Sequence, residues 1–137
     1  IDMANCGVTI DYGHGLVAYE NIAESIAVLK KYGDKLFHLH MNDNYTLWDD
    51  DMIVGSIHTI PYIEMFYWLK RTGYDRWIST DQYPYREDGR DAVNESVRWM
   101  ETYIDVVNRL DDNKVEKIIN TGNACEASAF LRELLFK

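Results

Sequence analysis

The sequence is poor in cysteine and in positive charge, and it has no long apolar run. Only two cysteines, Cys6 and Cys125, occur among 137 residues, and they match neither a disulfide framework nor the CxxC spacing of a metal module. A reducing compartment is therefore expected, and we predict a cytoplasmic protein. No stretch approaches the roughly 18 apolar residues of a membrane helix, so no membrane partner is expected.

Negative charge clearly exceeds positive charge. Lys and Arg number 14 against 23 Asp and Glu, which gives a formal net charge of −9. Nucleic-acid affinity rests on Lys and Arg contacts to phosphates, so this balance disfavours a nucleic-acid partner. The hydrophobic content of 47% argues against general disorder and allows one sizeable core.

Short apolar strands alternate with longer helical patterns along the chain. Strands are expected at residues 7–11, 36–40 and 77–81. Helices are expected at residues 20–32, 61–73 and 89–107, the last from the recurring apolar positions Val93, Val97, Met100, Ile104 and Val107. This alternation implies right-handed crossovers and a parallel sheet, so the predicted class is α/β.

The predicted architecture is the last three strand-helix units of a (β/α)₈ TIM barrel. Strand ends recur at intervals near the roughly 30 residues per unit of such a barrel, with extra loop in the second interval. The alternative is an open doubly wound sheet, but the stretch after the first strand lacks the GxGxxG spacing that seats a dinucleotide. We assign residues 1–111 to the barrel and 112–137 to a C-terminal helical extension.

Two further expectations follow from this partial barrel. The chain has no initiator Met and runs almost directly into an apolar strand, which suggests a piece of a longer chain. Three strands also leave open edges and an uncovered inner face, so we expect a homo-oligomer.

Each predicted strand has one polar face, and that face ends in an acidic or imidazole side chain. Side chains alternate along a strand, so Asp11, His40 and Asp81 share the polar face of their strands. The carboxyl ends of barrel strands meet at one mouth, where the three should converge. Two carboxylates and an imidazole suit Mn²⁺, Mg²⁺, Co²⁺ or Zn²⁺. The alternative for each residue is a cap or loop hydrogen bond.

Two short stretches carry a family resemblance. VTIDYGH, residues 8–14, and HLHMND, residues 38–43, resemble two signatures of the xylose-isomerase-like barrels, which contain sugar isomerases and epimerases. The resemblance implies that Asp11, His40 and Asp81 bind the metal, that Asp81 and His14 are catalytic, and that His14 binds substrate or a second metal. The first metal ligand of the family, a Glu on the preceding strand, would lie upstream of this chain.

The polar loop at residues 42–57, here called the acidic loop, contains the run Asp49-Asp50-Asp51. Similar aldose isomerases place a DxD pair on this loop, so the resemblance implies that Asp49 and Asp51 hold a second metal beside His14. Asp49 and the neighbouring Trp48 are also candidate substrate-binding residues. The alternative is a solvated acidic loop with no ligand role.

The resemblance implies a metal-dependent sugar isomerase that interconverts an aldose and a ketose at C1 and C2, with Mn²⁺ as the expected cofactor and a small sugar as its partner. Asp81 in place of the Glu of many epimerases favours the L-rhamnose isomerase branch. The alternatives are a ketose 3-epimerase and a sugar-phosphate or inositol isomerase. An apurinic endonuclease and a non-catalytic binding protein are more distant alternatives.

Overall fold

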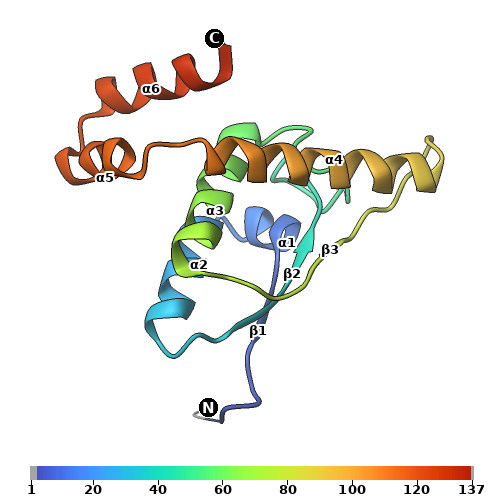
Figure 1. Ribbon diagram of the computed structural model, residues 1–137. Coiled ribbons are helices and arrows are strands. Elements are labelled where there is room, and N and C mark those ends of the chain that lie inside the picture. Colours follow the sequence, from blue (N-terminus) through green and yellow to red (C-terminus); the bar gives the residue numbers. More distant parts are fainter. Residues whose placement is uncertain (1–2, 137) are drawn as a thin grey trace.

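The computed structural model describes residues 3–136, which form a parallel sheet with helices packed mainly on one face (Figure 1). Three strands lie in the order β1 (Val8–Asp11), β2 (Leu36–Met41) and β3 (Ile78–Thr80). The helices are α1 (Tyr12–Val17), α2 (Ile22–Lys31), α3 (Thr59–Thr72), α4 (Gly89–Asn108), α5 (Asp112–Thr121) and α6 (Ala124–Phe136). The α/β class and the parallel sheet agree with the sequence pattern.

The register of the sheet brings the strand ends level with one another. Asp11 pairs with His40 across β1 and β2. On the other side of β2, the Asp81 N–H donates to the Met41 carbonyl at 2.9 Å, which continues the pairing one residue beyond β3. These polar residues therefore lie along the carboxyl edge of one parallel sheet.

The hydrophobic core fills the space between the sheet and helices α2, α3 and α4. Ile10 and Leu39 point into it from the strands, and Ile26 and Phe66 point into it from α2 and α3. Sequence periodicity located these helices correctly, and α3 ends at Gly73, whose left-handed φ of 67° suits a residue without a Cβ atom.

Stacked aromatic rings continue the core beneath the strand ends. The Tyr12 and Tyr62 ring centroids lie 4.0 Å apart, and the Tyr62 and Tyr103 centroids lie 5.3 Å apart. All three side chains are almost fully buried. The stack joins α1, α3 and α4, so the residue that directly follows Asp11 anchors the end of β1 in the core.

The segment after β1 has the two closely spaced glycines typical of a loop, Gly13 and Gly15, yet residues 12–17 form α1. The Asp11 side chain accepts a hydrogen bond from the His14 N–H at 3.1 Å and so caps the first turn. Two glycines hid this short helix from sequence reasoning because glycine disfavours a helix interior.

Helix α4 buries part of the stripe that its periodicity predicted, because Met100 and Val107 are buried and the other three positions are not. Val93, Val97 and Ile104 of the predicted face are about 40% exposed. The side chains it buries are Ala92, Ser96, Met100, Tyr103 and Val107. Helix α4 packs on the core mainly through its small residues and Tyr103. Within the described residues, Val93, Val97 and Ile104 form an apolar stripe that stays exposed.

The C-terminal helices α5 and α6 stand apart from the sheet, beyond α3 (Figure 1). Neither helix contains a fully buried residue. Ion pairs attach α5 to α3, with Lys70 Nζ 3.1 Å from Asp112 and Arg71 3.3 Å from Glu116. Among residues 3–136, no helix combines the length and the apolar character needed to cross a membrane.

Candidate metal centre

The three strand-end residues predicted as metal ligands converge in the structure. Asp11, His40 and Asp81 each offer one ligand atom, and these atoms lie within 4.8 Å of one another. His40 Nδ1 is 3.2 Å from Asp81 Oδ2 and 3.6 Å from Asp11 Oδ2. We call this group the strand-end triad; its two carboxylates and imidazole form an O/N donor set that suits a divalent cation.

Local hydrogen bonds orient Asp11 within the triad. Its Oδ1 accepts the His14 N–H and faces the amide of Asn42 at 3.5 Å. Its Oδ2 is thereby turned toward His40. A carboxylate fixed in this way presents one oxygen to a cation while the other is held by the protein, which is the usual role of groups that support metal ligands.

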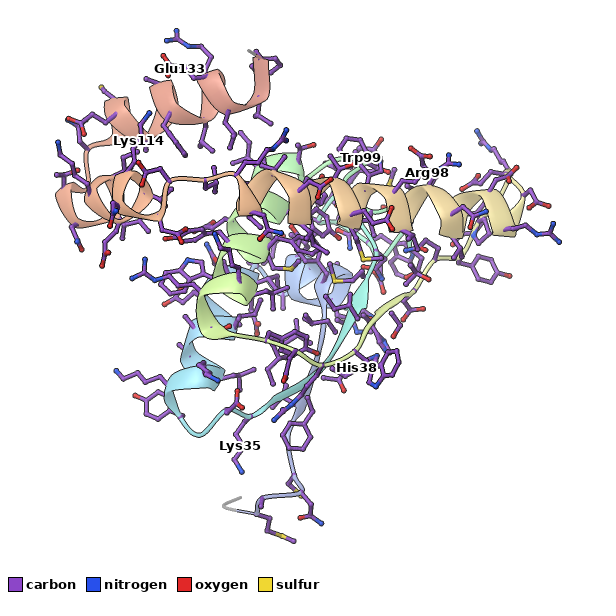
Figure 2. All side chains as sticks on the ribbon, viewed as in Figure 1. Lys35, His38, Arg98, Trp99, Lys114 and Glu133 are labelled. Carbon is purple, nitrogen blue, oxygen red and sulfur yellow. The ribbon has the colours of Figure 1, made fainter. Side chains whose placement is uncertain are left out.

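His38 lies on β2 two residues before His40 and has a different role in the structure (Figure 2). Its Nε2 lies 2.5 Å from the Ser79 hydroxyl on β3. The His38 and His40 rings meet edge to face at 5.1 Å. His38 therefore joins two strands and supports the His40 ring.

The residues predicted for a second metal are less closely gathered. His14 Nε2 lies 2.7 Å from Asp49 Oδ2, whereas Asp51 Oδ1 accepts a hydrogen bond from Asn42 at 2.9 Å. Among the residues that the structure describes, the strand-end triad is the one group of three or more His, Cys, Asp or Glu side chains that lie close enough to share a metal ion. The structure thus pairs His14 with Asp49, whereas Asp51 shares the Asn42 amide with Asp11 of the triad.

Neighbouring carboxylates affect the pKa of Asp51. Partial burial and the nearby Asp49 raise the pKa of Asp51, with smaller contributions from Asp81 and Asp11, while the hydrogen bond from Asn42 lowers it. The negative charges of three neighbouring carboxylates therefore repel the charge of Asp51 at this edge of the sheet. A bound cation would relieve that repulsion, so the residues present fit a divalent metal.

Exposed aromatic side chains lie in the acidic loop and in the segment after β3. Trp48 is 71% exposed, and Tyr83 and Tyr85 meet at a centroid distance of 5.1 Å. The Tyr83 N–H donates to the Asp51 carbonyl at 3.1 Å, which ties this segment to the acidic loop. Exposed rings beside a polar cluster are suited to contact the apolar face of a sugar.

Sequence reasoning missed the polar residues that support this site. Asn42, Asp43 and Asn44 are all fully buried although they begin a polar loop. His58, the residue at the N-cap position of α3, makes no side-chain cap hydrogen bond and instead contacts Asp43 at 2.7 Å. The Asn-Asp-Asn order after HLHM was the available signal, but asparagine and aspartate ordinarily indicate an exposed turn.

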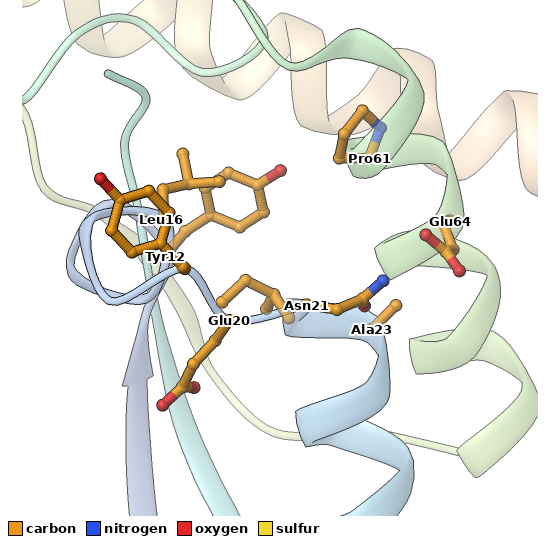
Figure 3. A pocket seen from close by; sticks show the side chains of 9 residues that line it. Tyr12, Leu16, Glu20, Asn21, Ala23, Pro61 and Glu64 are labelled. Atoms are coloured by element: carbon orange, nitrogen blue, oxygen red, sulfur yellow. The ribbon is translucent and has the colours of Figure 1, made fainter. Parts of the chain in front are cut away.

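A separate pocket lies between the α1–α2 connection and α3 (Figure 3). Its lining includes Glu20, Asn21 and Glu64, and none of the predicted site residues contributes to it. The strand-end triad is instead an open cluster, because Asp81 is about half exposed.

Comparisons with known proteins agree with this fold. Residues 1–103 match the family model described as xylose isomerase-like TIM barrel. A solved structure entitled "Crystal structure of D-tagatose 3-epimerase-like protein" is 35% identical, with a TM-score of 0.64 over 79% of this chain. A search of curated proteins gives no match.

The chain belongs to the xylose isomerase-like TIM barrel family. Its sheet and helices form part of such a barrel, as the sequence predicted, and place it in a superfamily of sugar isomerases and epimerases. The chain spans 38% of the length of the epimerase-like protein, so an activity of the whole barrel can only be proposed from it.

Proposed function

We propose that the strand-end triad holds a divalent cation, Mn²⁺ by preference, in a sugar isomerase that interconverts an aldose and a ketose at C1 and C2. The observation that carries the proposal is the convergence of Asp11, His40 and Asp81 within 4.8 Å on three adjacent strands. A cation bound there would act as a Lewis acid toward the sugar oxygens.

The side chains around the triad have distinct tasks in this proposal. Asp81 faces the open side of the cluster, where an open-chain sugar would lie beside it. The His14–Asp49 pair can take and return a proton at a sugar hydroxyl, because an imidazole paired with a carboxylate is a suitable acid-base group near neutral pH. Trp48 would cover the apolar side of the sugar chain.

A ketose 3-epimerase is the second candidate, and the structural neighbour named as D-tagatose 3-epimerase-like favours it. The two reactions place different demands on the residue at position 81. Asp81 Oδ2 already lies 3.2 Å from His40, so its short side chain is directed to the cation position. A carboxylate that must also reach a substrate carbon needs more length, and this favours the isomerase.

The test is an interconversion assay of the barrel that contains this chain, with pentoses and hexoses, after chelation of metal and after addition of Mn²⁺. We expect turnover to vanish on chelation, to return with Mn²⁺, and to be lost in His40→Ala. NMR analysis of the products separates exchange at C1 and C2 from inversion at C3. Turnover that survives chelation would contradict the proposal.

The proposal includes self-association of the chain. Strands β1 and β3 each have one neighbour in the described sheet, and Val93, Val97 and Ile104 leave an apolar stripe on α4. Unpaired strand edges and apolar stripes favour association. Light scattering should give a mass above the 16.1 kDa of one chain, and a folded monomer would contradict this expectation.

We also propose a cytoplasmic location. Cys6 and Cys125 are both free thiols, which fits a reducing compartment.

A further inference from the structure

Three consecutive polar residues at the start of the acidic loop are fully buried. Asn42, Asp43 and Asn44 each have 0% exposed side chains, directly after the last residue of β2. Burial of polar groups costs free energy unless their hydrogen bonds are satisfied. The hydrogen-bond partners of these side chains therefore indicate which groups the segment fixes in place.

Asn42 links the strand-end triad to the acidic loop. Its amide nitrogen donates to Asp51 Oδ1 at 2.9 Å and faces Asp11 Oδ1 at 3.5 Å. The Asn42 carbonyl in turn accepts a hydrogen bond from the buried Tyr62 hydroxyl. A neutral donor is thus fixed between two carboxylates, one of them in the triad.

Asn44 holds the other carboxylate of the loop pair. Its amide nitrogen donates to the Gly13 carbonyl at 3.0 Å and to Asp49 Oδ1 at 3.3 Å. Asp49 Oδ2 remains directed at His14. Gly13 permits this approach, because a Cβ atom there would lie 2.3 Å from Asn42 Oδ1 and 2.5 Å from Asp49 Oδ1.

Asp43 closes the base of the loop. Its Oδ2 accepts the N–H groups of Ile57 and His58 at 2.8 and 3.0 Å, and its Oδ1 lies 2.7 Å from His58 Nδ1. Its backbone pairs with Met52 in both directions. The two ends of the acidic loop are therefore joined through one buried carboxylate.

We propose that Asn42, Asp43 and Asn44 are positioning residues, with Asn42 orienting the triad ligand Asp11, and Asp43 with Asn44 fixing the acidic loop beside it. This inference rests on the proposed metal site. It assigns Asn42 an effect on cation affinity, since groups that support metal ligands typically change affinity by about 10–100-fold when removed. It assigns Asn44 an effect on loop order and on the His14–Asp49 pair.

The test compares Mn²⁺ binding to the barrel that contains this chain, followed by electron paramagnetic resonance, in wild type, Asn42→Ala, Asn44→Ala and the exposed control Asn94→Ala. We expect Asn42→Ala to weaken Mn²⁺ binding by about 10–100-fold. Asn94→Ala should retain wild-type affinity. Affinity unchanged in Asn42→Ala, even with lowered thermal stability, would show a merely structural role and overturn the inference.

Hydrogen exchange on the wild type supplies a second measurement that does not need a folded variant. Mn²⁺ should slow exchange of the amides held by this segment, those of Thr46, Ile57 and His58. Mn²⁺ that binds without protecting these amides would overturn the inference and leave the metal site intact. A wild type that binds no Mn²⁺ would overturn the proposed metal site itself.

Discussion

Asp11→Asn should abolish Mn²⁺ binding while leaving the fold intact. Asn is as good a helix N-cap as Asp, so the hydrogen bond from the His14 N–H to the side chain at position 11 is retained. The change removes the negative charge that Asp11 Oδ2 presents beside His40. We expect a loss of affinity larger than the roughly 10–100-fold caused by removal of a supporting group. Isothermal titration with Mn²⁺ measures it.

Asp50→Asn is the matched control for this experiment. It removes one negative charge from the same edge of the molecule, where Asp50 accepts only a long 3.4 Å hydrogen bond from the Tyr45 N–H. Both variants lose one negative charge, and only Asp11→Asn alters the triad. Equal Mn²⁺ affinities for the two variants would show that Asp11 is not a ligand.

Tyr12→Ala should destabilise the chain by about 3–5 kcal/mol, the usual cost of truncating a buried aromatic residue. Tyr12 is 1% exposed and stacks on Tyr62 at 4.0 Å. Its removal leaves a cavity between α1 and α3, directly behind Asp11. Urea denaturation followed by circular dichroism should show a large fall in the free energy of unfolding, or a chain that no longer folds.

Tyr12→Phe isolates the ring from its hydroxyl. The Tyr12 hydroxyl is buried without a hydrogen-bond partner among the described residues, and this burial strongly raises its pKa. An unsatisfied buried hydroxyl costs about 1–3 kcal/mol, so the phenylalanine variant should be at least as stable as wild type. A clear loss of stability in Tyr12→Phe would show that the hydroxyl has a partner and contradict the packing described here.

The strand-end triad was predictable because two simple rules determine it. Alternation along each strand places Asp11, His40 and Asp81 on one face, and parallel strands bring their carboxyl ends to one edge. The same rules located β1, β2 and β3 and the helices between them. Both rules depend on local sequence and on the handedness of crossovers. Neither of these depends on how the surrounding side chains pack.

The supporting residues could not be predicted, because their role depends on tertiary contacts. Asn42 and Asn44 have the composition of an exposed turn, yet they are buried, and their amides reach the Asp11 carboxylate and the Gly13 carbonyl, each 31 residues away in the chain. The buried face of α4 likewise combines Met100 and Val107, which its apolar periodicity predicted, with Tyr103, which the aromatic stack holds in the core. Hydrophobic pattern alone does not report such polar and aromatic contacts.

The most direct test of the metal site is an anomalous difference map, recorded at the manganese absorption edge, from crystals grown with Mn²⁺. The proposal predicts a peak bounded by Asp11 Oδ2, His40 Nδ1 and Asp81 Oδ2, and no such peak in Asp11→Asn crystals. Manganese located elsewhere, or a triad without a peak in crystals that bind the ion, would contradict it.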